Sequence, residues 1–326
     1  MKSPKIYLCA FGNLNLSVAA YRFYHQALSM GIFENIFIYN ECNLDLDFVR
    51  EFRDRFYEVV KLPQSFSAPA GGGELTSDSF GGGRYDPFFM GEKIVRVTRG
   101  FGYWCWKPQV ILQSLRQINE GDILIYADIG CEFVPSKAKS LLEKLKELEH
   151  NDIMGFACGG LPEKHWTKGD VFRYFGVEND PRFTESTQIA GGFVFMKKSP
   201  KTLEIINEWL FVFKNHYNLV DDSPSQTPNH KDFRENRHDQ SIWGMINKKH
   251  RLKNFHYSGD DDLGEFGILV SRKSHNTMGL MFDTNGRFRL GKYKIIRALL
   301  KIGSKISFNR NTRKQCRSLH FLSQPK

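Results

Sequence analysis

The sequence predicts an α/β domain with a mainly parallel central sheet flanked by helices, followed by a basic C-terminal tail. The domain is predicted from two short apolar segments typical of buried strands, 5–10 and 35–39, each followed by a helical pattern, 17–30 and 44–60. This alternation favours parallel strands, because each helix carries the chain back across the sheet. The tail is predicted from charge, since no acidic residue follows Asp283.

The pattern breaks at residues 65–91, which contain two Gly-Gly-Gly runs and two prolines, and we expect a long flexible loop there. Regular structure then resumes. Ser199 and Pro200 supply an N-cap and a first-turn proline for one of the later helices. We expect further strands over 122–126, 152–157 and 190–196, and further helices over 107–117, 136–148, 200–215 and 239–248.

Charge divides the 326 residues into a body, 1–285, and a tail, 286–326. The formal net charge is +10, but 12 of the 46 basic residues follow Asp283. The chain up to Asp283 therefore holds 34 basic and 36 acidic residues, which makes the body slightly acidic. With no basic body and no recognised binding motif, the sequence argues against a nucleic-acid partner.

Composition and cysteine usage favour a cytoplasmic protein. A hydrophobic content of 41% excludes a wholly disordered chain, and no apolar run approaches the 18 or so residues of a membrane-spanning helix. The six cysteines show no Cys-x-x-Cys spacing, which argues against a zinc or redox site. Four of them lie in apolar segments, as expected of reduced core residues: Cys9, Cys105, Cys131 and Cys158.

Within the tail, residues 292–308 alternate apolar and basic positions at helical spacing. Arg297, Lys301 and Lys305 fall on the face opposite the isoleucines and leucines. This pattern is typical of a helix lying on an anionic membrane surface, which would hold the protein peripherally at the inner face of the cytoplasmic membrane. A C-terminal helix docked on the body with a solvated charged face fits the same pattern.

Asp128 is the first candidate site residue. It comes directly after the apolar strand expected over 122–126 and Ala127, and Gly130 lies two residues further on. Ligands of parallel α/β sheets bind beyond the carboxyl ends of strands, and a carboxylate there can hold Mg²⁺ or Mn²⁺ on a diphosphate. Taken alone, the same residues also favour a tight turn.

Asp239 and Gln240 form the second candidate, at the start of the helix predicted for 239–248. Asp239 is a suitable N-cap residue, and the start of a helix carries partial positive charge. An acid and an amide there are also placed to face a sugar or a leaving group. The two roles are compatible.

Lys107 is the third candidate, between Trp106 and Pro108. Pro108 fits the first turn of a helix, which places Lys107 at its cap, where an ammonium and free N–H groups suit a phosphate. We expect Trp104 and Trp106 to form core or wall. His256 and His275 are possible metal ligands, although each alone also fits a structural residue.

In their order along the chain, these motifs resemble nucleotide-sugar-dependent glycosyltransferases of the GT-A type, a Rossmann-like fold, particularly bacterial enzymes of capsule and lipopolysaccharide assembly. The resemblance covers roughly residues 4–275. The similar segments are GYWCWKPQVILQSL and GDILIYADIG, the glycine-led IAGGFVFMKKSP, RHDQSIWG and FHYSG. Two positions depart from the family pattern: Gly130 replaces the second acid of Asp-x-Asp, and Ile189 replaces the Asn before Ala-Gly.

The resemblance implies a role for each candidate. Asp128 would bind a divalent cation, Mn²⁺ or Mg²⁺, and the diphosphate, with His256 and His275 as further metal ligands. Asp239 and Gln240 would flank the anomeric carbon as catalytic residues. The remaining residues would contact the nucleotide sugar: Ala10, Phe11, Gly12, Lys107, Gly130, Gly191 and Gly192.

The predicted function is therefore transfer of a sugar, by resemblance from a UDP-sugar, to a glycan or lipid-linked acceptor in surface-polysaccharide assembly. The Asp-Gln pair leans toward retention of configuration; in an inverting reaction, Asp239 would be the base. Two alternatives stay open. One is a sugar-nucleotide or phosphate-ester hydrolase that uses the same acid and cation, and the other is a non-enzymatic protein that binds a membrane or a nucleic acid through its tail.

Overall fold

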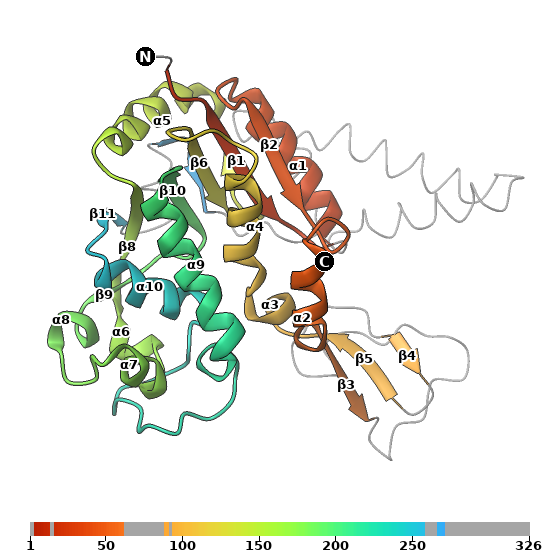
Figure 1. The fold of residues 1–326 in the computed structure, drawn as a ribbon, viewed down its shortest axis with the longest axis vertical. Helices are drawn as coiled ribbons and strands as arrows, with labels where there is room; N and C mark the ends of the chain where they lie inside the picture. The colour runs from red at the N-terminus through yellow and green to blue at the C-terminus, as the bar shows by residue number, and fades with distance from the viewer. Residues whose placement is uncertain (1–2, 14–15, 62–87, 91–92, 258–265, 271–326) are drawn as a thin grey trace, which may run out of the picture.

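The computed structural model describes residues 3–13, 16–61, 88–90, 93–257 and 266–270, and its centre is a seven-stranded sheet (Figure 1). The strand order is β2-β1-β6-β10-β8-β11, with β9 paired to β8. Strands β2, β1, β6, β8 and β11 run in one direction, and β10 and β9 run in the other. The strands are β1 (Ile6–Phe11), β2 (Asn35–Tyr39), β6 (Ile123–Ala127), β8 (Ile153–Pro162), β9 (Thr187–Ile189), β10 (Phe193–Lys197) and β11 (Lys253–Tyr257).

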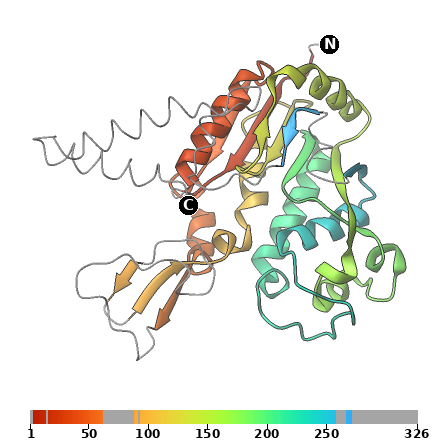
Figure 2. The same cartoon turned by 180° about the vertical axis from the view of Figure 1, so that it is seen from behind.

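Helices cover both faces of this sheet, as Figures 1 and 2 show from opposite sides. On one face lie α2 (Leu46–Phe56), α4 (Trp106–Leu115), α9 (Pro200–Asn215) and α10 (Asp239–Lys249); on the other lie α1 (Ser17–Ser29) and α5 (Ala138–Leu145). Alternation along β1 supplies both cores: Tyr7 and Cys9 pack on the α4 side, Leu8 and Ala10 on the α1 side. The predicted α/β class is confirmed.

Helix α4 is buried along its whole length, since every residue from Trp106 to Leu115 is buried. It packs against β1 on one side and α9 on the other. A helix enclosed in this way must also bury its polar residues, and Lys107 is one of them. This burial decides the chemistry of the site described below.

The smaller elements extend or connect this core. A three-stranded sheet, β3 (Tyr57–Lys61), β5 (Lys93–Val97) and β4 (Phe88–Met90), stands apart from the central sheet in Figure 1. A second small sheet pairs β7 (Glu132–Phe133) with β12 (Ile268–Leu269). The short helices are α3 (Gly100–Tyr103), α6 (Glu163–Trp166), α7 (Gly169–Phe175), α8 (Pro181–Thr184) and the 3₁₀ turns Pro135–Lys137, Lys146–Glu149 and Tyr217–Leu219.

Three predicted elements differ from the structure. The helix expected over 44–60 ends at Phe56, because the next residues, rich in valine, pair with β5 as a strand. The strand expected over 190–196 begins only at Phe193, and Gly191 and Gly192 lie in the turn before it. Within the loop expected over 65–91, Phe88–Met90 forms β4.

Several predictions concern residues outside the described part of the chain. The rest of the loop 65–91 is one, and the basic tail 286–326, with its membrane-facing helix at 292–308, is another. The division into body and tail therefore stays a prediction. Among the described helices, none is long and apolar enough to cross a membrane.

The cap of α9 gives a direct test of the local sequence reasoning. The Ser199 side chain accepts a hydrogen bond of 3.1 Å from the Thr202 N–H, as the Ser-Pro motif predicts. Ser199→Ala should lower the free energy of unfolding by about 1 kcal/mol in urea denaturation, because this N–H loses its acceptor. Lys201→Ala, an exposed change in the same turn, should cost less than about 0.5 kcal/mol. Equal losses would show that the cap contributes nothing of its own.

A candidate active site around Lys107

Asp128 directly follows β6 and lies on the α4 side of the sheet. Alternation places it on the same side as Tyr126, whose phenolic O–H donates to Asp128 Oδ1 at 2.5 Å. Burial, and then the nearby Asp128 carboxylate, raise the pKa of Tyr126 well above its ordinary value. The phenol therefore keeps its proton and stays a donor. The Asp128 carboxylate is 40% exposed, so one side of it faces solvent.

Lys107 brings a buried positive charge to this carboxylate. Its ammonium contacts three groups: Asp239 Oδ2 at 2.5 Å, the Gly191 carbonyl at 2.9 Å and Asp128 Oδ1 at 3.5 Å. Burial alone would lower the pKa of Lys107, but Asp128 and Asp239 together outweigh burial and raise it. Lys107 is thus a permanent cation shared by two carboxylates. The helix begins at Trp106, so Lys107 lies inside its first turn and not at the predicted cap.

Asp239 is the more deeply buried of the two carboxylates, with 7% of its side chain exposed. Burial raises its pKa to about 6, against the opposing effect of Lys107. Asp239 is the first residue of α10, and the predicted capping role is wrong, because His238 occupies the N-cap. His238 has a φ of 53°, which is rare for a residue with a side chain, and its Nδ1 lies 2.6 Å from the Val220 carbonyl oxygen.

A turn of two glycines closes the site between the carboxylates. A Cβ at Gly191 would lie 3.0 Å from Asp239 Oδ2, and a Cβ at Gly192 would lie 3.1 Å from Asp128 Oδ2. The turn is held by hydrogen bonds from the Asp128 N–H to the Gly192 carbonyl and from the Gly191 N–H to Gln240 Oε1. A side chain at either glycine would therefore crowd a carboxylate, whereas the predicted contact with a sugar stays a prediction.

The structure therefore brings together six of the predicted site residues, from four parts of the chain: Lys107, Asp128, Gly191, Gly192, Asp239 and Gln240. Ala10 and Phe11, at the end of β1, are buried in the two cores, and Phe11 stacks on Trp106 at 4.2 Å between ring centroids. Their side chains thus belong to the cores, and their contact with a nucleotide sugar stays a prediction. Trp106 is a wall residue, as expected.

Gly12 and Gly130 lie beside the cluster, in its supporting turns. A Cβ at Gly12 would meet Ile129 at 3.2 Å, so this glycine lets the end of β1 approach the turn that follows Asp128. That turn is held by Arg22, which donates to the carbonyls of Ile129 and Cys131 at 2.8 and 2.7 Å. The sequence reasoning missed Arg22, although an arginine within the predicted helix 17–30 was the available signal.

The predicted metal ligands are only partly tested by the described residues. His256 is exposed on β11, and the strand order places β10 and β8 between β11 and β6, so His256 lies about 14 Å across the sheet from Asp128. His275 lies outside the described residues. In the part of the chain that the structure describes, no three His, Cys, Asp or Glu side chains gather as metal ligands. The metal site with Asp128 therefore stays a prediction.

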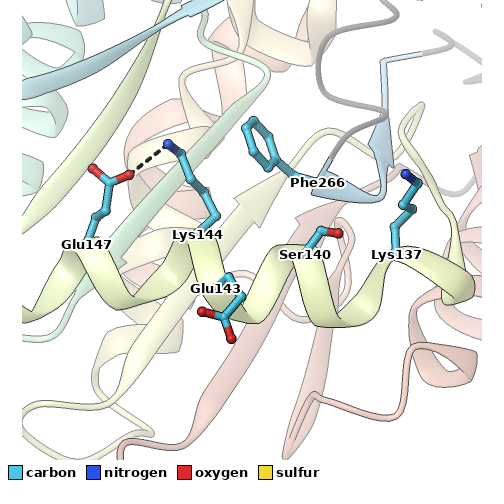
Figure 3. A pocket seen from close by; sticks show the side chains of 6 residues that line it. All are labelled: Lys137, Ser140, Glu143, Lys144, Glu147 and Phe266. Atoms are coloured by element: carbon cyan, nitrogen blue, oxygen red, sulfur yellow. Dashed lines mark hydrogen bonds and ion pairs between the residues drawn. The ribbon is translucent and has the colours of Figure 1, made fainter.

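A separate hollow of about 580 Å³ lies along α5 (Figure 3). Its lining consists of Lys137, Ser140, Glu143, Lys144, Glu147 and Phe266. The ion pair from Lys144 to Glu147, 2.8 Å long, belongs to this helix surface. None of the lining residues belongs to the Lys107 cluster, and none was predicted to bind a ligand.

No protein-family model matches the sequence. Comparison with curated proteins also finds no match. Solved structures do match, among them two glycosyltransferases. One is a glycosyltransferase involved in glycosylation of the major capsid of PBCV-1, with 8% sequence identity over 78% of this chain and 82% of that chain and a TM-score of 0.38. Another is mouse xyloside xylosyltransferase 1, with 12% identity over 79% of this chain and 86% of that chain and a TM-score of 0.37. A putative glucose-1-phosphate thymidylyltransferase from Bacillus anthracis also matches, with 9% identity over 78% of this chain and 87% of that chain and a TM-score of 0.32.

The buried ion pair can be tested by removing its cation. Lys107→Leu leaves Asp239 buried without its counter-charge and should lower the free energy of unfolding by about 3–5 kcal/mol at pH 8. The loss should shrink at acidic pH, where Asp239 takes up a proton. Lys214→Ala, which breaks the exposed pair with Glu51, is the control and should cost less than about 1 kcal/mol. Urea denaturation of both variants at pH 5 and pH 8 measures these losses. A loss of unfolding free energy in Lys107→Leu that does not depend on pH would contradict the pairing.

Proposed function

We propose that this chain is a glycosyltransferase that moves a sugar from a nucleotide-diphosphate sugar to a glycan or glycolipid acceptor. One observation carries the proposal: a buried ammonium is held between two carboxylates, beside a glycine turn, at the edge of the sheet where β1 and β6 end. This is the edge where ligands of parallel α/β sheets bind. The order of motifs along the chain supports the same function.

The cluster combines the charges that this reaction needs. Breaking the bond between a sugar and a diphosphate develops negative charge on the leaving oxygen, and a fixed cation nearby stabilises that charge. Lys107 is such a cation, already fixed by Asp239 and by the Gly191 carbonyl. It therefore needs no reorganisation when the charge develops.

Asp239 and Gln240 are the groups that we place against the sugar. An ionised Asp239 stabilises positive charge that develops at the anomeric carbon. In a retaining reaction the leaving diphosphate takes the proton of the acceptor hydroxyl, and in an inverting one Asp239 takes it. We favour retention because of the resemblance of the Asp-Gln segment. The resemblance of the motifs as a whole favours a UDP-sugar as the donor and a role in surface-polysaccharide assembly. The basic tail would hold the protein near a membrane-borne acceptor.

The first test concerns Asp239. Asp239→Asn should abolish transfer, because the amide carries no charge, while circular dichroism stays unchanged. In the wild type, kcat should fall as the pH drops through about 6, where Asp239 becomes protonated. Transfer is measured as acceptor-dependent release of nucleoside diphosphate, so release that is equally fast without acceptor would indicate a hydrolase.

Stability provides the control for this pH profile. The pKa of Asp239 is about 6 in the folded chain and about 3.9 in an unfolded one, so the folded state binds the proton more tightly. Its contribution to stability is therefore complete below pH 4 and is lost as the pH rises through 6. Activity and this contribution thus change in opposite directions. Near-normal turnover by Asp239→Asn would contradict the assignment.

The second test identifies the donor and the cation. A nucleotide sugar that binds the folded chain should raise its melting temperature in proportion to the logarithm of its concentration above the dissociation constant. We expect a UDP-sugar to give the largest rise, a further rise with Mn²⁺, and loss of that further rise with a chelator. Lys107→Leu should abolish the response to the donor. An equal response to every nucleotide sugar would contradict a specific donor site.

A further inference from the structure

Glu163, the first residue of α6, is a fully buried carboxylate that no predicted motif includes. Its oxygens accept three hydrogen bonds: from Lys248 Nζ at 2.5 Å, from the Thr167 hydroxyl at 2.6 Å and from Gln188 Nε2 at 3.1 Å. Gly244 on α10 leaves space for this carboxylate, since a Cβ at Gly244 would lie 2.4 Å from Glu163 Oε1. The chain thus encloses a charge that the cluster around Lys107 does not touch directly.

Two amides in series connect this carboxylate with the candidate active site. Gln188, on β9, is fully buried and donates through Nε2 to Glu163 at 3.1 Å and to the Trp166 carbonyl at 3.3 Å. Its Oε1 accepts a hydrogen bond of 2.5 Å from Gln240 Nε2. Gln240 Oε1 in turn accepts from the Gly191 N–H at 3.3 Å, and the Gly191 carbonyl accepts from Lys107. The series therefore runs from Glu163 to the glycine turn.

A carboxylate can only accept hydrogen bonds, and this fixes the direction of the whole series. Gln188 must turn its NH₂ group toward Glu163, so its oxygen faces Gln240. Gln240 must then turn its own NH₂ group toward Gln188, which leaves its oxygen on the side of Gly191. We infer that Glu163 and Gln188 are positioning residues that set the orientation of the Gln240 amide.

This orientation matters to the site in two ways, the second of which rests on the proposed function. It pins Gly191 from both sides, because Gln240 holds its N–H while Lys107 holds its carbonyl. It also presents a carbonyl oxygen, which has two lone pairs, where a sugar hydroxyl can donate to it. A reversed amide would set an N–H group against the Gly191 N–H and would offer the sugar a donor.

A double-mutant cycle tests the fixed direction. In Gln240→Glu, the new carboxylate at position 240 faces the side-chain oxygen of Gln188, and neither group can donate. The Gln188 amide cannot reverse, because its oxygen would then face the Glu163 carboxylate. In Glu163→Gln/Gln240→Glu, residue 163 can donate, so Gln188 can reverse and donate to the new carboxylate. Thr167 can still bond residue 163 by rotating its hydroxyl, and Lys248 retains an oxygen acceptor. The bonds among residues 163, 188 and 240 are then satisfied again, and the longer bond from Gln188 Nε2 to the Trp166 carbonyl, 3.3 Å, is lost.

The expected result is rescue. The melting temperature of the double variant should exceed that of Gln240→Glu by about 3 °C or more, although Glu163→Gln alone lowers it. Gln113→Glu is the control, since Gln113 is a buried amide bonded to Asn43, Asp45 and Gln109, away from the series. Its effect should add to that of Glu163→Gln without rescue. A double variant no more stable than additivity predicts would overturn the inference.

Kinetics then separate this inference from the proposed function. Gln188→Leu should lower kcat/KM for the donor by up to about 100-fold, because Gln240 loses its orientation. Gln113→Leu, the same change in another buried amide, should leave kcat/KM within about twofold. Equal losses in both would reduce Gln188 to a structural residue. If no transfer is found in any variant, the proposed function fails, while the melting-temperature cycle still decides on the series.

Discussion

The candidate site depends on one electrostatic constraint, a single ammonium that is buried with two carboxylates. Lys107 lies on a helix that is enclosed on all sides, so its charge must be compensated within the protein. Asp239 and Asp128 supply this compensation from two other segments, and together they carry one negative charge more than the lysine does. The excess falls on the side of Asp128, the more exposed of the two carboxylates. The site is therefore open to a cationic group or to a ligand that brings a cation with it.

The sheet explains how four separate segments meet at this point. Strand β6 delivers Asp128, and its antiparallel neighbour β10 begins at the glycine turn, so the turn and the carboxylate lie side by side. Helix α4 brings Lys107 over the same edge, and α10 begins there with Asp239. Each of these elements also contributes to the hydrophobic core on that face. Core packing and charge pairing therefore stabilise the same arrangement.

Local sequence patterns predicted most elements and four members of the cluster, because alternation, capping and strand ends are visible over short windows, whereas the two glycines came from the family resemblance. Ser199 before Pro200 is one example, and Asp128 after an apolar strand is another. Contacts made across the fold were not predictable in this way. Nothing near Asp239 shows that Lys107 would meet it, and the capping preference of an aspartate favoured the wrong position. Glu163 and Gln188 carry no local signal at all, since their role exists only when β9, α6 and α10 are packed together. The burial of Ala10 and Phe11 in the two cores likewise depends on how the helices pack against β1.

The glycine turn between β9 and β10 also limits how the chain can change in length. Gly192 lies beside Asp128, and Phe193 lies opposite Ala127 in the ladder of β10 and β6. Because successive side chains of a strand point to opposite faces, a slip of β10 by one residue would bring its core side chains to the wrong face. An added or deleted residue in this turn would therefore displace the core of the sheet together with the site. Insertions are expected in segments that do not pair with a strand, such as the connection between α7 and β9. The length of the glycine turn, in contrast, is held constant by packing alone.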